Sequence, residues 1–163
     1  MNNELSNRLC RDLTQEEIER YHQDGAAVIR QVLPPAWIEL MQRAVDQVLD
    51  APTQGGAEYT DQTQGKGRFY GDFFMWLQND DFRSFFHHSP MVEMASQLMG
   101  SKKVNAFYDH LLVKEPQTLA ATPLHQDVPY WPVRGEQIVS IWCPFDSANR
   151  DSGIVQYIKG SHL

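Results

Sequence analysis

The sequence predicts an α+β domain, with helices in the first hundred residues and strands in the remainder. Apolar residues recur at helical spacing before residue 100, whereas short apolar runs bounded by turn residues follow it. A length of 163 residues corresponds to one domain with a single core. We therefore expect one domain, residues 1–163, with a helical portion at about 12–100 and a strand portion at about 103–163.

The first helix is expected over residues 14–24. Thr14 can cap its N-terminus, and Glu17, three residues later, completes a capping box. Gly25 suits the helix exit, where a left-handed residue is favoured. The apolar run at 26–32 then predicts a short buried strand.

Three further helices are expected. Pro34-Pro35 can begin the first of them, because proline is tolerated in a first helical turn. Its apolar residues recur at i, i+3, i+4 and i+7, and they are Trp37, Leu40, Met41, Ala44, Val45, Val48 and Leu49. Shorter helices are expected at 80–87 and 89–100. The glycine-rich residues 51–72 are expected to form a long loop near an active-site mouth.

The second half of the chain has the pattern of strands. We expect them at 104–114, 125–130, 137–144 and 154–158, where short apolar runs lie between turn residues. Helices followed by antiparallel-type strands are typical of α+β proteins.

Composition excludes several classes of protein. The net charge is -7, with no long basic run, which argues against a nucleic-acid partner. No apolar stretch is long enough to span a membrane, and the first twenty residues do not resemble a secretory signal. Cys10 and Cys143 show no pairing or metal-site pattern, which is expected of reduced thiols in the cytoplasm.

The most informative motif is His125-Gln126-Asp127. In an extended strand, residues i and i+2 point to the same face, so His125 and Asp127 can reach one metal ion together. An imidazole and a carboxylate are two of the three ligands in the 2-His-1-carboxylate site of non-haem iron oxygenases. The third ligand has to come from elsewhere. The alternatives are a surface ion pair or a capped turn.

Several other sequence segments accompany this motif along the chain. They are Leu13–Ile18, Asp24–Arg30, Tyr108–Pro116, Asn149–Gly153 and Lys159–His162. The whole run, over roughly residues 12–163, resembles the phytanoyl-CoA dioxygenase family of Fe(II)- and 2-oxoglutarate-dependent oxygenases. The resemblance implies a double-stranded β-helix, or jelly roll, with the N-terminal helices packed on one sheet. In that family a second iron-binding His and a 2-oxoglutarate-anchoring Arg follow tens of residues later, beyond Leu163. We therefore expect a C-terminally truncated oxygenase domain with an incomplete roll.

The resemblance also implies a set of site residues. His125 and Asp127 would be metal ligands for Fe(II), with 2-oxoglutarate and dioxygen as cosubstrates. The positions that match residues close to 2-oxoglutarate in relatives are Trp142, Thr122 and Lys114. Tyr130 and Trp131 follow the ligands and would line the substrate pocket. The plainer alternatives are a core tryptophan, a solvated lysine and aromatic rim packing.

The expected activity is hydroxylation of a small molecule, coupled to conversion of 2-oxoglutarate to succinate and CO2. Related halogenases carry Ala or Gly in place of Asp127, so the aspartate favours hydroxylation. The alternative is a non-catalytic or truncated family member that acts as a binding domain. A zinc hydrolase lacks a nearby third ligand and a placed general base. We expect His110 to be a hydrogen-bonded core histidine, and His162 to follow a turn without binding iron.

Overall fold

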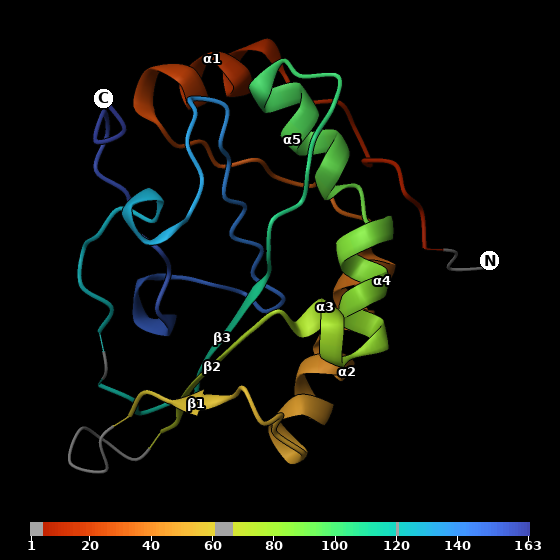
Figure 1. Ribbon diagram of the computed structural model, residues 1–163, viewed down its shortest axis with the longest axis vertical. Helices are drawn as coiled ribbons and strands as arrows, with labels where there is room; N and C mark the ends of the chain where they lie inside the picture. The colour runs from red at the N-terminus through yellow and green to blue at the C-terminus, as the bar shows by residue number, and fades with distance from the viewer. Residues whose placement is uncertain (1–4, 61–66, 120) are drawn as a thin grey trace.

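The computed structural model describes residues 5–60, 67–119 and 121–163. Within these residues, five α-helices and three short strands form a mixed α and β structure, which agrees with the predicted α+β class. Helices α2, α3 and α4 lie on one side of the sheet, and α1 and α5 pack at the opposite end of the molecule (Figure 1). The described strands form a single open antiparallel sheet, so the expected jelly roll is not confirmed.

Helix α1 (Gln15–Asp24) begins and ends where its capping residues predict. The Thr14 hydroxyl accepts a hydrogen bond from the Glu17 amide at 3.2 Å, and the Glu17 carboxylate accepts one from the Thr14 amide at 2.9 Å. Gly25 ends the helix in the left-handed conformation, with φ +76°. The strand expected at 26–32 is wrong, because this segment joins no sheet and Gln31 turns the backbone with φ +57°.

Helix α2 (Pro35–Asp50) buries Trp37, Met41, Ala44 and Val48, four residues of the predicted apolar stripe. The main core cluster joins this face to α3 (Met75–Gln78), α4 (Asp80–His88) and the sheet. Its buried members are Met41, Ala44, Val48, Tyr70, Met75, Phe82 and Leu111. Burying side chains of this size contributes roughly 1.5–3 kcal/mol each. This cluster fixes α2 and α4 against the sheet.

Helix α5 (Met91–Met99) follows Ser89-Pro90 and ends at Gly100, as predicted. Its residues Met94 and Leu98 pack with Leu13 and Val32 in a second buried cluster. The segments before and after α1 are therefore held against α5. Among the described residues, no helix combines the length and apolarity that crossing a membrane requires.

The sheet has the order β1-β2-β3, from Ala57–Glu58, Phe69–Phe73 and His110–Lys114. The antiparallel register of β2 and β3 pairs Phe73 with His110 and Asp72 with Leu111. Part of the expected loop at 51–72 is therefore strand, although residues 61–66 lie outside the described residues. The strand expected at 104–114 is shorter than predicted and begins only at His110.

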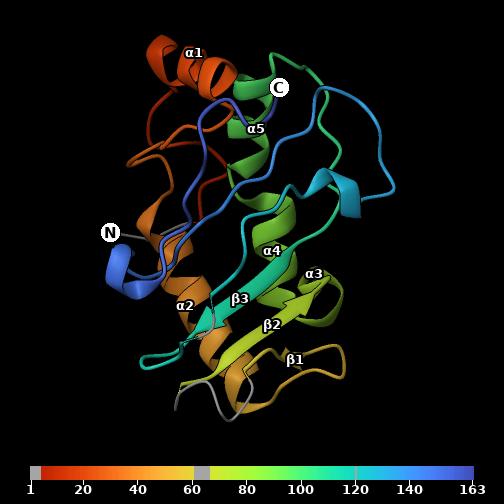
Figure 2. The ribbon, with the colours of Figure 1, turned by 90° about the vertical axis from the view of Figure 1, so that its left-hand side faces the viewer.

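The strands expected at 125–130, 137–144 and 154–158 are wrong. These segments carry no described sheet pairing, and Val128–Tyr130, within the first of them, forms a short 3-10 helix. A second 3-10 helix, Arg150–Ser152, precedes the last segment. The segments at 137–144 and 154–158 are extended and run beside the helices (Figure 2). Their apolar residues still find partners, because Val139 and Ile141 pack on the α5 cluster and Phe145 on the main core. The apolar residues of these segments therefore pack against the core, although the segments do not form strands.

Candidate metal centre

The side chains of His125 and Asp127 meet just before the 3-10 helix at Val128–Tyr130. His125 Nε2 lies 3.1 Å from Asp127 Oδ1, and the two side chains are 44% and 45% exposed. The sequence argument for their meeting relied on an extended strand, and that argument is wrong. Asp127 has helical dihedral angles, φ -73° and ψ -41°, and this bend gives the two side chains their relative position.

A backbone contact sets the tautomer of His125. Its Nδ1 lies 2.8 Å from the carbonyl oxygen of Pro123, and a carbonyl can only accept a hydrogen bond. Nδ1 therefore carries a proton, and in the neutral ring Nε2 presents a lone pair. A backbone carbonyl that fixes the ring in this way is the usual partner of a metal-binding histidine.

The facing atoms require a cation between them. A neutral His125 would leave two acceptor atoms, its Nε2 and Asp127 Oδ1, 3.1 Å apart, where they repel each other. A proton on Nε2 or a bound metal ion removes this repulsion. Two neighbouring ligands of an octahedral ion, each at about 2.1 Å, lie about 3.0 Å apart. The observed separation therefore fits both a charged ion pair and one edge of a metal site.

A third ligand is not grouped with this pair. Within residues 5–60, 67–119 and 121–163, no cluster of three or more His, Cys, Asp or Glu side chains is arranged to hold a metal ion. His162 does not lie at the site, because its Nε2 contacts the carbonyl oxygen of His22 at 3.1 Å. Among the described residues, His125 and Asp127 are therefore the two candidate ligands that lie together.

The negative charge of Asp127 affects the pKa of two further side chains, His110 and Tyr157. Partial desolvation by the protein atoms around it lowers the pKa of His110, although the residue is exposed, and the negative charge of Asp127 acts in the opposite direction. Partial desolvation likewise raises the pKa of the exposed Tyr157, and Asp127 raises that pKa further. His110 is an exposed residue whose ring stacks on Phe73 at 3.9 Å between centroids, so the expected hydrogen-bonded core histidine is wrong. No local pattern indicates this contact, because it arises from the pairing of β2 with β3.

The two aromatic residues after the motif have different surroundings. Tyr130 is 77% exposed, and its ring centroid lies 6.3 Å from that of His125. Trp131 is partly buried, and its Nε1 donates a hydrogen bond to the Tyr108 hydroxyl at 3.0 Å. It also makes an edge contact with Phe107. Tyr130 is therefore beside the ligand pair, whereas Trp131 belongs to an aromatic cluster.

The residues expected to contact 2-oxoglutarate fall into two places. Lys114 Nζ donates to the Thr122 hydroxyl at 3.4 Å and lies 4.5 Å from the centre of the Phe69 ring. Trp142 instead lines an apolar crevice of about 260 Å³, together with Cys143 and Met94. None of the other predicted site residues lines that crevice in the described structure. The structure brings Lys114 and Thr122 together and leaves Trp142 elsewhere.

The protein has a mixed α and β fold, and His125 with Asp127 forms its candidate metal centre. Residues 21–163 match the sequence model of the family described as Phytanoyl-CoA dioxygenase (PhyH). Because this match covers most of the chain, the chain belongs to that family, and the resemblance seen in the sequence is confirmed. Proteins of this family are in general Fe(II)- and 2-oxoglutarate-dependent dioxygenases. Neither the curated proteins nor the solved structures give a match.

Proposed function

We propose that this chain provides the iron-binding face of an Fe(II)- and 2-oxoglutarate-dependent dioxygenase that hydroxylates a small molecule. The observation that carries the proposal is the 3.1 Å approach of His125 Nε2 to Asp127 Oδ1, with Nδ1 held by Pro123. Membership of the phytanoyl-CoA dioxygenase family supports it. The donor set of one imidazole and one carboxylate suits Fe(II).

Each residue of the pair has a defined task in this proposal. Pro123 keeps the proton of His125 on Nδ1, so that Nε2 is free to bind the metal. Asp127 contributes a negative charge that offsets part of the charge of the ion. When bound, Fe(II) with 2-oxoglutarate and dioxygen supplies the oxidant for hydroxylation of a C–H bond. The two side chains would occupy only part of the coordination sphere and would leave positions for the cosubstrates.

Lys114 and Thr122 are the proposed contacts for the distal carboxylate of 2-oxoglutarate. An ammonium and a hydroxyl 3.4 Å apart can both donate to one carboxylate, and charged hydrogen bonds are the stronger kind. Trp142 is a third proposed contact, on the basis of the resemblance alone. Tyr130, exposed beside His125, is proposed to contact the substrate. Trp131 is proposed to line the same substrate pocket, held in place by its hydrogen bond to the Tyr108 hydroxyl.

The test is succinate formation from 2-oxoglutarate, with Fe(II), ascorbate and oxygen present. We expect turnover by the wild type, and loss of it in His125→Ala and Asp127→Ala. His22→Ala is the matched control, because that histidine lies on α1 and should leave turnover unchanged. Wild-type protein that binds Fe(II) and 2-oxoglutarate without forming succinate would instead indicate the binding-domain alternative. Absence of both binding and turnover would overturn the proposal.

A further inference from the structure

The segment that carries the two candidate ligands is weakly attached to the rest of the fold. Residues 124–126 belong to no helix or strand, and within the described structure their backbone groups make no hydrogen bond. The contact of His125 with Pro123 is local, and so is the contact between His125 and Asp127. These contacts set the two side chains relative to each other, but they do not hold the segment against the rest of the protein.

Gln126, the residue between the two ligands, makes the attachment that its neighbours lack. Its side-chain amide nitrogen donates a hydrogen bond to the backbone carbonyl oxygen of Ser161 at 2.5 Å, across 35 positions of sequence. Among the described residues, this is the one hydrogen bond that joins residues 124–127 to a distant part of the chain. Because Gln126 is bonded to both ligand residues, a contact that holds its side chain also restrains the backbone on either side.

Ser161 belongs to a turn, residues 159–162, that is itself attached to helix α1. The Lys159 ammonium lies 2.8 Å from the Asp24 carboxylate, and the Gly160 amide donates to the Asp24 carbonyl oxygen at 2.8 Å. Both ribbon views place this end of the chain beside α1 (Figure 1, Figure 2). We call residues 159–162 the C-terminal turn. A continuous set of contacts therefore runs from the end of α1, through the C-terminal turn, to the residue between the ligands.

We propose that Gln126 is a positioning residue for the candidate metal centre. The inference rests on the proposed function, because it concerns the binding of a metal ion by the same pair of ligands. The hydrogen bond from Gln126 to Ser161 holds the ligand segment against the C-terminal turn, and α1 holds that turn in place. Ligands that are ordered before the ion arrives lose less conformational freedom on binding, so their affinity is higher. Gln126 acts through the backbone of its neighbours and is not itself a ligand.

Titration of the full chain with Co(II) measures the effect of Gln126 on metal affinity. Co(II) takes the place of Fe(II) because the visible absorption of the bound ion reports its coordination geometry. Gln126→Met keeps the length of the side chain but removes the donor, and it should weaken Co(II) binding about fivefold and alter the absorption bands. Gln137→Met is the matched control, because the Gln137 amide also donates to a backbone carbonyl oxygen, that of Met99, at 3.1 Å. It should bind Co(II) as the wild type does.

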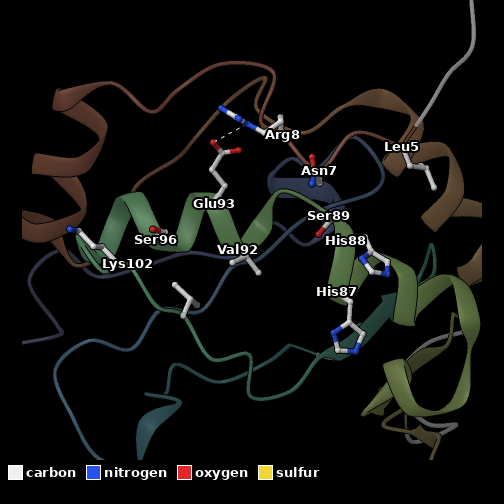
Figure 3. Close-up of a pocket in the computed structure, with 11 residues that line it drawn as sticks. Leu5, Asn7, Arg8, His87, His88, Ser89, Val92, Glu93, Ser96 and Lys102 are labelled. Atoms are coloured by element: carbon white, nitrogen blue, oxygen red, sulfur yellow. Dashed lines mark ion pairs between the residues drawn. The ribbon is translucent and has the colours of Figure 1, made fainter.

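Lys159→Met tests the attachment of the C-terminal turn to α1. It removes the ion pair with Asp24 and should weaken Co(II) binding about twofold, because an exposed ion pair contributes little. When it is added to Gln126→Met, it should have no further effect, since the connection is already broken. Arg8→Met is the matched control. The Arg8 side chain also forms an exposed ion pair, 3.5 Å from Glu93, but in a pocket at the start of α5 (Figure 3).

NMR of the metal-free protein gives a second readout of the same contact. The ring proton signals of His125 should shift in Gln126→Met and in Lys159→Met, and stay unchanged in Gln137→Met. Co(II) affinity that is equal in the wild type and Gln126→Met, or equally reduced in Gln126→Met and Gln137→Met, would overturn the inference and leave the proposed function standing. Unchanged His125 signals in Gln126→Met would do the same. Wild-type protein that binds no Co(II) would overturn the proposed function and this inference with it.

Discussion

The imidazole of His162 occupies the space beside Gly25 that a side chain at that position would need. A β-carbon on residue 25 would lie 2.3 Å from His162 Nδ1, and the glycine has φ +76°. The same C-terminal segment contacts α1 through Lys159, whose ammonium lies 2.8 Å from the Asp24 carboxylate. The Gly160 amide also donates to the Asp24 carbonyl oxygen at 2.8 Å. The last residues of the chain therefore cover the C-terminal end of α1.

Gly25→Ala is expected to destabilise the fold by more than backbone strain alone. Strain in the left-handed region costs roughly 1–2 kcal/mol, and displacement of His162 adds to it. Gly100→Ala is the control, because Gly100 also has positive φ but no atom of the described residues lies within 4 Å of its β-carbon position. Urea unfolding measures both. Gly25→Ala combined with His162→Ala should recover part of the loss, and equal losses for the two single variants would contradict the described contact.

Asp109 is expected to make the fold less stable as the pH rises through about 6. Burial raises its pKa to about 6 from the ordinary 3.8, and the charge of Asp72 adds to the effect. The protonated form is thus favoured in the folded state, so the contribution is fully present below pH 4 and lost above pH 6. The loss is of the order of 2 kcal/mol.

Asp109→Asn tests this directly. The amide oxygen can still accept the hydrogen bond that the Trp76 amide donates to Asp109 Oδ2 at 3.1 Å. The difference in unfolding free energy between variant and wild type should change between pH 4 and pH 6.5, in favour of the variant at the higher pH. A difference that stays constant across this range would show that Asp109 does not titrate as described.

Glu17 is expected to have the opposite effect in a lower pH window. A hydrogen bond from Arg11 is the main cause that lowers its pKa to about 2, and the Thr14 amide assists. Two nitrogen atoms of Arg11 contact the two carboxylate oxygens at 2.7 and 2.9 Å. The stabilisation is present above pH 4.5 and lost as the pH falls toward 2. Glu17→Gln should remove this acid sensitivity in thermal unfolding, and unchanged acid sensitivity would contradict it.

Signals that act over a few residues predicted the helices well. The Thr14 and Glu17 capping box, the apolar stripe of α2 and the glycine after α5 all depend on neighbours within one or two turns. Strands depend on a partner that is distant in sequence. The segments at 137–144 and 154–158 have the composition of strands, but they lie unpaired in the described structure.

The candidate site was predictable only in part, for the same reason. The spacing of His125 and Asp127 predicted that their side chains meet, although a bend and not a strand brings the atoms together. The structure brings Lys114 close to Thr122, and their role near 2-oxoglutarate stays a prediction. The stacking of His110 on Phe73 depends on the register of two strands that are far apart in sequence. No local pattern carries that information.

Anaerobic calorimetric titration with Fe(II), in the presence of 2-oxoglutarate, tests the central claim most directly. The account predicts saturable binding at one site, reduced at least about tenfold by His125→Ala or by Asp127→Ala, and unchanged by His22→Ala. Binding that is equal in the wild type and in both ligand variants would show that the two side chains form only a charged ion pair, and would contradict the account.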